Sequence, residues 1–248
     1  MSERNLGRRT VLVTGASRGI GAAVARAFAA VGDRLVLHHR DSPDLIEKVR
    51  LSLPGTGHTV VRCDLSDPEA VAATMETIDH LDVLVNNAGI YVEHRILDVS
   101  YEQWQESWQR TLATNLVGPA NLTWWAVRTM RPGGRIINVS SRGAFRGEPR
   151  FPAYGASKAG LNAFGQSMAR ALGPHGISVA TVAPGYIETD MTTAALSGPE
   201  GDDIRAQSPL GRVGTPEEVA AAVLYLASPE ASYASGAILD LNGASYLR

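Results

Sequence analysis

The sequence predicts an α/β protein built on a doubly wound parallel sheet. Short apolar runs rich in β-forming residues alternate with longer helical patterns along the 248 residues, which is typical of successive βα units. Several of the short runs are almost wholly apolar, as strands covered on both faces are. This length also suits a TIM barrel, but a glycine-rich turn directly after the first strand favours the doubly wound sheet.

The predicted strands are runs in which apolar and β-branched residues dominate: Thr10–Val13, Arg34–Leu37, Thr59–Arg62, Val83–Val85, Arg135–Val139, Ser178–Val182 and Ala237–Leu241. The predicted helices lie between them: Ile20–Val31, Leu45–Leu51, Pro68–Ile78, Tyr101–Met130, Ala153–Leu172 and Pro216–Leu226. In the last of these, Val219, Val223 and Leu226 recur at helical spacing and form a core-facing stripe.

One segment, Ile187–Gly214, has weak periodicity and many Gly, Pro, Ser and Thr residues. We expect it to be a mobile substrate loop rather than a domain boundary. The whole chain, residues 1–248, is therefore expected to form one domain.

Composition excludes several classes of protein. With 23 basic and 25 acidic side chains the net charge is −2, so there is no basic excess for nucleic acid. The single cysteine, Cys63, excludes an internal disulfide, and the histidines show no metal-ligand spacing. Met1 to Arg9 lacks the apolar run of a signal peptide, and Thr111 to Val127 is too short and polar to span a bilayer. We expect a cytoplasmic protein with no membrane, metal or nucleic-acid partner.

A glycine-rich turn, Thr14 to Gly21, follows the first strand and precedes an alanine-rich helix. Its spacing is G-x-x-x-G-x-G rather than the general G-x-G-x-x-G. The physical logic is the same, because glycines allow the tight turn and a close backbone approach to a pyrophosphate. The positive end of the following helix then faces the phosphates. This turn indicates a Rossmann-like dinucleotide site.

Tyr154 and Lys158 stand at i and i+4, so both side chains project from one face of a helix. A free phenol has a pKa near 10. An ammonium about 4 Å away favours the phenolate by roughly 4 kcal/mol at an effective dielectric of 20. We therefore expect Lys158 to lower the pKa of Tyr154 towards the range of a general acid.

Several motifs, in one order along nearly the whole chain, together resemble the short-chain dehydrogenase/reductase family. They are Thr14–Gly21, Asn86–Gly89, Tyr154–Lys158, Pro184-Gly185 and Gly211–Val219. The nearest resemblance is to the bacterial 3-oxoacyl-thioester reductase branch. It implies a Rossmann-like sheet of seven parallel strands with helices on both faces.

The resemblance also implies catalytic roles. Ser141 would orient the substrate oxygen, and Tyr154 would protonate it as hydride arrives from the nicotinamide. Lys158 would hold the nicotinamide ribose, and Asn115 would hold a water that relays protons to Lys158. Ser140 is the rival of Ser141, but the thirteen-residue spacing to Tyr154 matches the family at Ser141.

NADP(H) is the expected cofactor. The position where NAD-binding members carry an acidic residue falls on His39, and Arg40 follows it; Asp41 is interpreted as part of a turn. Arg18 and Arg40 would bind the 2′-phosphate. Asp64 and Leu65 would meet the adenine, with a helix cap as the alternative role of Asp64. The complete set of expected cofactor residues is Gly15, Ser17, Arg18, Gly19, Ile20, Gly21, His39, Arg40, Asp64, Leu65, Asn87, Ala88, Gly89, Tyr154, Lys158, Pro184, Gly185, Ile187 and Thr189.

The substrate class implied by the resemblance is a 3-oxoacyl thioester or a polyketide-like ketone. Carrier-dependent members usually have basic residues where this chain has Pro132 and His175, which favours a small free ketone, alcohol or sugar as the alternative to a substrate on acyl carrier protein. A non-catalytic NADP-binding regulator is a third hypothesis. Four arginines near the site mouth could attract an anion or belong to a solvated loop surface: Arg95, Arg142, Arg146 and Arg150. The family usually assembles as a homotetramer or homodimer.

Overall fold

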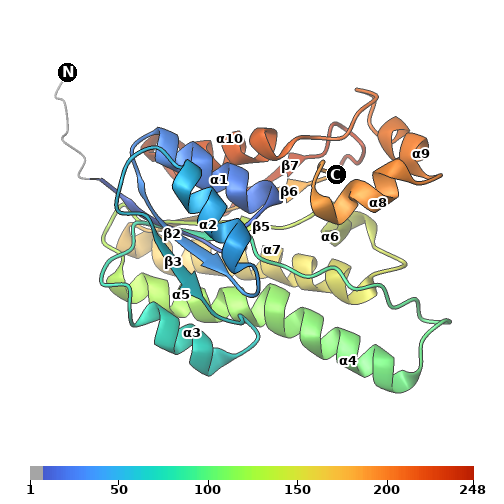
Figure 1. Cartoon of the computed structure of the whole chain (residues 1–248), viewed down its shortest axis with the longest axis horizontal. Coiled ribbons are helices and arrows are strands. Elements are labelled where there is room, and N and C mark those ends of the chain that lie inside the picture. Colours follow the sequence, from blue (N-terminus) through green and yellow to red (C-terminus); the bar gives the residue numbers. More distant parts are fainter. Residues whose placement is uncertain (1–7) are drawn as a thin grey trace.

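The computed structural model describes residues 8–248, which contain a sheet of seven parallel strands in the order β3-β2-β1-β4-β5-β6-β7 (Figure 1). The strands are β1 (Thr10–Val13), β2 (Arg34–His39), β3 (Thr59–Arg62), β4 (Val83–Asn86), β5 (Arg135–Val139), β6 (Ser178–Pro184) and β7 (Ile238–Leu241). The predicted doubly wound fold is confirmed, and each predicted strand is found within two residues of its expected ends. Residues 1–7, part of the segment assessed for a signal peptide, lie outside the described residues.

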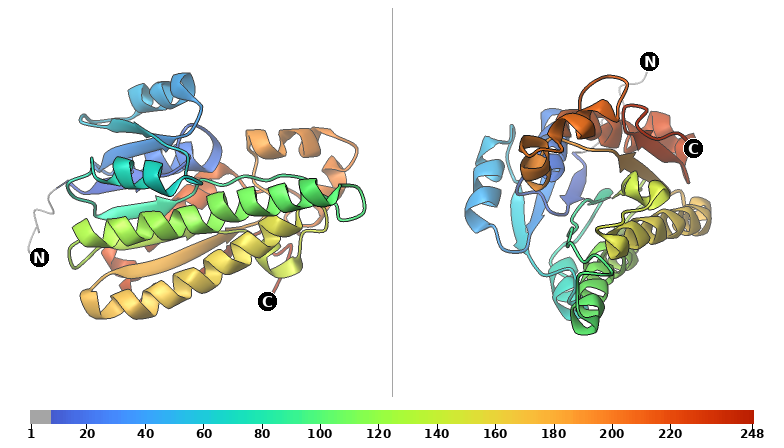
Figure 2. Two further views of the ribbon diagram at one scale, coloured as in Figure 1. Left: turned by 90° about the horizontal axis from the view of Figure 1, so that it is seen from below. Right: turned by 90° about the vertical axis from the view of Figure 1, so that its right-hand side faces the viewer.

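Helices cover both faces of the sheet (Figure 2). One layer holds α1 (Gly19–Ala30), α2 (Pro43–Ser52) and α10 (Pro216–Leu226); the other holds α3 (Pro68–Met75), α4 (Tyr101–Leu112), α5 (Gly118–Thr129) and α7 (Pro152–Leu172). Side chains of β1 point alternately to the two faces of the sheet. Val11 and Val13 pack into one core, and Leu12 packs into the other. Short elements are α6 (Gly143–Arg146) and the 3-10 turns η2 (Gly173–His175) and η3 (Pro229–Ala234).

The prediction of one continuous helix over Tyr101–Met130 is wrong at its centre. Ala113–Val117 (η1) forms a π-helical turn between α4 and α5. Pro119 has no N–H to donate to the carbonyl of Asn115 four residues earlier, and its ring crowds that carbonyl. The chain widens instead, so that the N–H of Gly118 bonds to the carbonyl of Ala113. The wide turn therefore falls on Asn115.

The segment predicted as a substrate loop contains two short helices, α8 (Asp190–Ser197) and α9 (Gly201–Ala206). Its ends meet, since the N–H of Gly214 donates to Tyr186 O at 2.9 Å and the N–H of Glu188 donates to Gly214 O at 2.9 Å. The excursion lies at the right of Figure 1, beside rather than on the two helical layers. The weak periodicity of this segment thus corresponds to short helices, and its mobility stays a prediction.

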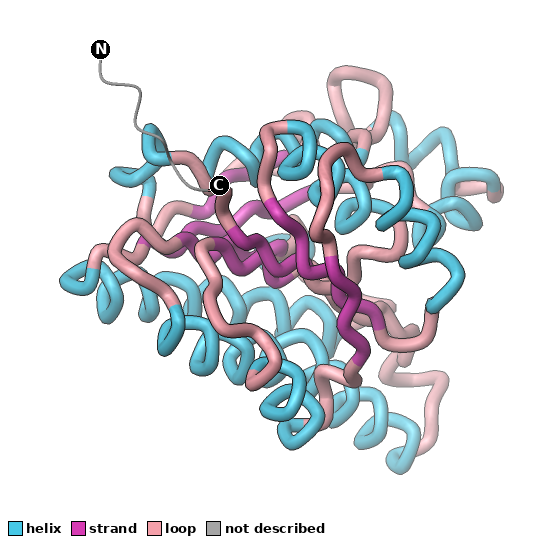
Figure 3. Tube along the Cα trace, turned by 60° about the vertical axis from the view of Figure 1, so that its left-hand side comes forward, coloured by secondary structure: helices cyan, strands magenta, loops and turns pink. Residues whose placement is uncertain are grey.

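The order of the strands determines where a ligand can bind. From β1 the chain moves outward to β2 and β3, and it then returns to β4 on the other side of β1. Where the connections that follow two adjacent parallel strands run to opposite sides, a crevice forms at the carboxyl ends of those strands. Figure 3 shows the twisted sheet running between the helices. No helix within residues 8–248 is long and apolar enough to cross a membrane.

Candidate active site

A cavity of about 420 Å³ lies at the carboxyl ends of the central strands. Every residue expected to touch a cofactor lines it, and so do Ser141, Tyr154 and Lys158. Asn115 lies behind this lining and is fully buried. The structure thus brings all the sequence-predicted site residues into one place. Within residues 8–248 there is no group of three metal-ligating side chains.

Three positions of the glycine turn have little or no room for a side chain: Gly15, Gly19 and Gly21. Gly15 and Gly19 have φ of +64° and +52°, in the left-handed region that favours glycine. A Cβ on Gly21 would lie 2.2 Å from the carbonyl oxygen of Gly15. Arg18 precedes α1 without capping it through its side chain, which leaves the first N–H groups of the helix for a ligand. This backbone cradle fits a pyrophosphate.

Two side chains that hold the turn from behind were not assigned this task from the sequence. His38 Nδ1 accepts the N–H of Gly15 at 3.2 Å, and its Nε2 donates to Cys63 O at 3.0 Å. Burial lowers the pKa of His38 to about 4, so the ring is neutral at pH 7. Asn87 Nδ2 donates to Thr14 O at 2.8 Å, so this predicted cofactor residue also braces the turn. His39 was the histidine expected at the cofactor, whereas its neighbour His38 is the one that holds the turn.

The far end of the cavity carries the two arginines expected at a 2′-phosphate. Arg40 bonds to the Asp41 carboxylate beside it, and Arg18 Nη1 lies 4.0 Å from Asp190 Oδ2. The Arg40 and Asp41 side chains are 39% and 60% exposed, so this pair is weak and can exchange for a phosphate. His39 Nδ1 accepts the N–H of Ser42 at 3.1 Å, which turns the chain into α2.

Asp64 lines the cavity, and the alternative helix-cap role is wrong for it. Its Oδ1 accepts the N–H and the hydroxyl of Ser66 at 2.9 Å and 2.7 Å. The N-cap of α3 is Asp67, whose carboxylate accepts the N–H of Glu69 at 2.9 Å. Leu65 is buried beside Gly118, where a Cβ would lie 2.7 Å from Leu65 O.

The two candidate serines point in different directions. Ser140 is buried, and its hydroxyl donates to Lys158 O at 3.2 Å. The hydroxyl of Ser141 accepts the N–H of Gly143 at 3.0 Å and hydrogen-bonds to Tyr154. Both serines line the cavity with the phenol, but the hydroxyl of Ser140 is taken up by the backbone, so Ser141 is the one placed to meet the same substrate oxygen.

The predicted lowering of the Tyr154 pKa is wrong in this structure. Burial raises the pKa of Tyr154 to about 12, against the opposing effect of the Ser141 hydrogen bond, and burial lowers the pKa of Lys158 to about 8. The cause is geometric: Lys158 Nζ donates to Val139 O at 2.8 Å and lies 5.7 Å from the centre of the Tyr154 ring. The ammonium is thus held on the backbone rather than on the phenol.

Asn115, on the π turn, connects α7 to the loop after β4. Its Nδ2 donates to Ile90 O at 3.0 Å and to Ser157 Oγ at 3.2 Å, and its Oδ1 accepts the N–H of Ile90 at 2.8 Å. A Cβ on Gly89 would lie 3.3 Å from Asn115 Oδ1 and 3.4 Å from Lys158 Nζ. The absence of a side chain at Gly89 therefore lets the amide and the ammonium approach the cavity together.

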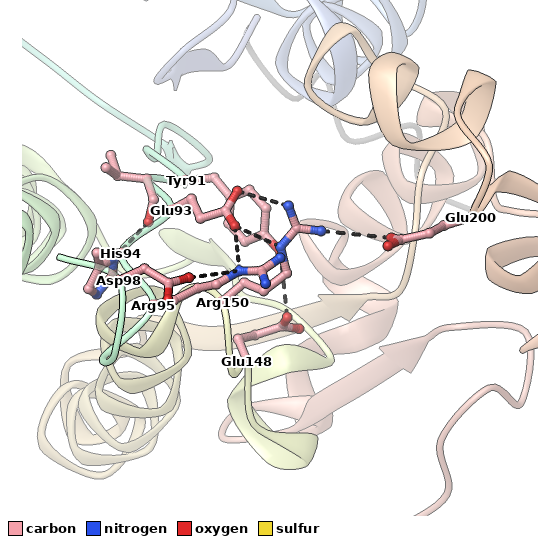
Figure 4. Close-up of polar contacts among 9 residues, drawn as sticks. Tyr91, Glu93, His94, Arg95, Asp98, Glu148, Arg150 and Glu200 are labelled. Carbon is pink, nitrogen blue, oxygen red and sulfur yellow. Dashed lines mark hydrogen bonds and ion pairs between the residues drawn. The ribbon is translucent and has the colours of Figure 1, made fainter.

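Tyr91 and Glu148 also line the cavity near Tyr154, and neither was singled out from the sequence. The ring of Tyr91 stacks on Phe151 at 3.6 Å and meets the ring of Tyr154 edge-on at 4.7 Å. Its hydroxyl lies 3.5 Å from Glu148 Oε2 (Figure 4). No local motif marks either residue, because only the folding of the loops after β4 and α6 brings them to the reacting end.

The arginines at the mouth are mostly committed to partners. Arg150 Nε and Nη2 donate to the Glu93 carboxylate at 2.9 Å and 2.8 Å, and its Nη1 lies 3.7 Å from Glu200 (Figure 4). Arg95 also donates to Glu93, at 2.8 Å. These partners leave little free positive charge for an anion at this rim.

Arg142 and Arg146 share Gln207 at the end of α9. Arg142 Nη2 donates to Gln207 Oε1 at 2.9 Å, and Arg146 Nη1 donates to the same oxygen at 3.1 Å. Arg142 also donates to Ser245 and is only 3% exposed, so the interpretation as solvated loop surface is wrong for it. Arg142 ties the segment after Ser141 to α9 and to the C-terminal residues.

Comparison with known sequences gives consistent matches over almost the whole chain. A family model described as enoyl-(acyl carrier protein) reductase matches residues 15–243. The chain is 39% identical over 249 residues to the 3-oxoacyl-[acyl-carrier-protein] reductase of Vibrio cholerae, covering 98% of this chain and 99% of the relative. It is also 39% identical over 254 residues to the L-rhamnose 1-dehydrogenase (NAD(P)(+)) of Azotobacter vinelandii, covering 96% and 97%.

Solved structures agree with this. The complex of BdcA with NADPH superimposes with a TM-score of 0.87 at 36% identity, covering 95% of this chain and 93% of the other. The angucycline C-6 ketoreductase LanV with bound NADP superimposes with a TM-score of 0.88 at 32% identity, covering 96% and 95%. Both neighbours hold the phosphorylated nicotinamide cofactor.

Proposed function

The chain belongs to the short-chain dehydrogenase/reductase family, and we propose on that premise that it is an NADPH-dependent ketone reductase. The substrate class supported by the relatives' names is a 3-oxoacyl thioester or a polyketide-like ketone. The observation that carries this proposal is that Ser141, Tyr154 and Lys158 line the same cavity as the glycine turn. A hydride donor bound along the turn and a carbonyl held by Ser141 and Tyr154 would then meet at the reacting end.

The cofactor residues fit NADP(H). The turn from Gly15 to Gly21 would hold the pyrophosphate on the N–H groups of α1, and Arg18 and Arg40 would bind the 2′-phosphate. The bound nicotinamide supplies the hydride, and Lys158 would hold the adjoining ribose hydroxyls. The NADPH and NADP bound to the neighbouring structures support the same choice.

The proton comes from Tyr154. Because burial raises its pKa to about 12, the phenol is protonated at pH 7 and can both donate to the carbonyl oxygen and give up its proton as the carbonyl carbon is reduced. The Ser141 hydroxyl would share that oxygen. The Lys158 ammonium, 5.7 Å from the ring centre, would stabilise the phenolate that remains. Asn115 would position the water through which Lys158 and then Tyr154 recover a proton.

A second candidate is a reductase or dehydrogenase of a small free ketone, alcohol or sugar. Pro132 and His175 precede β5 and β6, so they lie at the amino ends of these strands, opposite the cavity, and they lack the charge expected for acyl carrier protein. The L-rhamnose 1-dehydrogenase relative supports this alternative. Strong turnover of thioesters with only trace activity on free ketones would favour the first candidate. A non-catalytic regulator has no need of Tyr154 and Lys158.

We also propose that the protein acts in the cytoplasm as a homodimer or homotetramer. Large apolar side chains are exposed along α4, η1 and α5: Tyr101 at 72%, Val117 at 47% and Trp124 at 51%. Helices with such a face support burial against a second copy. Light scattering during size-exclusion chromatography tests this, and a monomer at micromolar concentration would contradict it.

Turnover of a ketone panel with NADPH tests the proposed function. In Tyr154→Phe, loss of the proton donor is expected to lower kcat by about 10²- to 10⁴-fold while NADPH still binds. Tyr225→Phe, on an exposed tyrosine of α10, is the matched control and is expected to keep the wild-type rate. Full turnover in Tyr154→Phe would show that the mechanism is wrong.

A further inference from the structure

A carboxylate faces the reacting end of the cavity without a strong partner. Glu148 follows α6 and lines the cavity with Ser141 and Tyr154, and its side chain is only 14% exposed. It packs against backbone, because a Cβ on Gly143 would lie 2.5 Å from Glu148 Oε1. Its backbone and Cβ also lie over Gly155, in the first turn of α7, directly after Tyr154. The carboxyl is therefore fixed beside the reacting groups.

The hydrogen-bonding capacity of Glu148 is largely unused. A carboxylate has room for about four hydrogen bonds. Among residues 8–248 the nearest donors are the Tyr91 hydroxyl at 3.5 Å, a long hydrogen bond, and Arg146 Nε at 4.0 Å. Glu93, drawn in the same close-up, differs sharply because it accepts three hydrogen bonds from Arg95 and Arg150 (Figure 4).

The neighbouring guanidinium groups are directed elsewhere. Arg150 stands only two residues from Glu148 but reaches out to Glu93 and Glu200. Arg142 lines the same cavity, but its Nη1 and Nη2 donate to Ser245 and Gln207 rather than to Glu148. Burial raises the pKa of Glu148 against the opposing charges of Arg146 and Arg142, neither of which forms a short hydrogen bond with it. The remaining acceptor positions of Glu148 are therefore open to a ligand in the cavity.

We propose that Glu148 selects the substrate: its carboxylate accepts a hydrogen bond from a hydroxyl that the substrate carries beside its reacting carbonyl. Hydroxyketones are then preferred to ketones that have no donor at this place. An unsubstituted oxoacyl chain would leave the buried carboxyl unpaired, and a site built around a polar partner rejects an analogue that lacks it. This inference rests on the proposed ketone reductase function and narrows its substrate class.

Two pairs of ketones, each differing by one or two hydroxyls, test the selection. The first pair is the N-acetylcysteamine thioester of acetoacetate and its analogue with a hydroxyl on the terminal carbon. The second is acetone and dihydroxyacetone. The hydroxylated member is expected to have a kcat/KM about 10- to 100-fold higher in the wild type. A larger preference within the first pair would indicate an acyl or polyketide-like hydroxyketone, and a larger preference within the second pair would indicate a sugar-like one.

Variants assign the preference to Glu148. Glu148→Leu is expected to lose the hydroxyl preference, through a higher KM for the hydroxylated members, while turnover of the unsubstituted members stays the same or rises. A general loss of packing would instead lower both. Glu200→Gln is the matched control, because this carboxylate is 68% exposed at the rim, and it is expected to keep the preference.

A binding measurement separates recognition from chemistry. The Kd of each ketone for the Tyr154→Phe protein saturated with NADPH is expected to show the same preference, and Glu148→Leu in that background is expected to abolish it. A hydroxyl preference that survives Glu148→Leu would overturn the inference. So would equal turnover of both members by the wild type, which leaves the proposed function intact. Failure of every ketone to oxidise NADPH would overturn the proposed function and this inference with it.

Discussion

Two adjacent substitutions with opposite effects test the 2′-phosphate site. Arg40→Gln removes a guanidinium that we place against the phosphate. Asp41→Asn removes the carboxylate that now accepts a hydrogen bond from Arg40. The first is expected to weaken NADPH binding and the second to strengthen it. Neither is expected to change NADH binding, because NADH has no phosphate at this position.

The magnitude follows from the exposure of the pair. A hydrogen bond to a charged group is worth about 1.5–3 kcal/mol. Binding the phosphate must first break the exposed Arg40–Asp41 pair, which is worth about 0.2–1 kcal/mol. The net loss in Arg40→Gln is then about 0.5–2.8 kcal/mol, or roughly a 2- to 100-fold higher Kd for NADPH. Asp41→Asn is expected to lower that Kd by about 1.5- to 5-fold.

Fluorescence titration of the purified protein with NADPH and with NADH measures both constants. Because the site is exposed, the difference between the two cofactors should narrow as salt is added. An equal weakening of NADPH and NADH in Arg40→Gln would refute the assignment and would point to damage of the whole site. Tighter NADH than NADPH in the wild type would refute the cofactor choice itself.

Three further predictions concern the backbone around the site. Gly21→Ala places a Cβ 2.2 Å from Gly15 O. Affinity for NADPH is expected to fall at least about 10-fold, measured by titration, and the free energy of unfolding by about 1–3 kcal/mol, measured in urea. Gly173→Ala, where no atom lies within 4 Å of the added Cβ, should change neither. The pKa of His38 is lowered from 6.5 to about 4 by folding. Its contribution to the free energy of unfolding is therefore fully present above pH 6.5 and is lost as the pH falls towards 4. Unfolding at pH 5 should cost about 2 kcal/mol less than at pH 7.5, and His38→Gln should remove this part of the dependence. Pro119→Ala supplies an N–H for the carbonyl of Asn115, so the π turn can become an ordinary α-helical turn and Asn115 shifts. We expect kcat to fall about 10-fold or more without loss of thermal stability; an unchanged kcat would show that the π turn is dispensable.

The parts of the fold and site that the sequence could predict are those carried by neighbouring residues. The glycine turn and the Tyr154–Lys158 pair are each complete within a few positions, so their spacing is sufficient to find them. The strands could be predicted because burial on both faces makes each of them a continuous apolar run. Pro119 was also a local signal, and a proline in the middle of a helix should have suggested the break at Asn115.

The remaining features depend on contacts between distant segments. His38 reaches Gly15, 23 positions earlier, and Tyr91 reaches Glu148, 57 positions later. The pKa of Tyr154 was predicted in the wrong direction because residue spacing fixes a helical face but not where Lys158 Nζ points. Burial of both groups, a property of the whole fold, then has the larger effect.

Arg150 bridges Glu93 and Glu200, and this bridge is weak on the Glu200 side only. Arg150 is fastened to Glu93 by two short hydrogen bonds, whereas its contact with Glu200, between α8 and α9, is a 3.7 Å ion pair with a 68% exposed carboxylate. An exposed pair is worth about 0.2–1 kcal/mol, so separating it shifts an open–closed equilibrium by about fivefold at most. If α8 and α9 move away, Arg150 stays bound to Glu93. The ion pair alone therefore adds only a small barrier to the exchange of ligands.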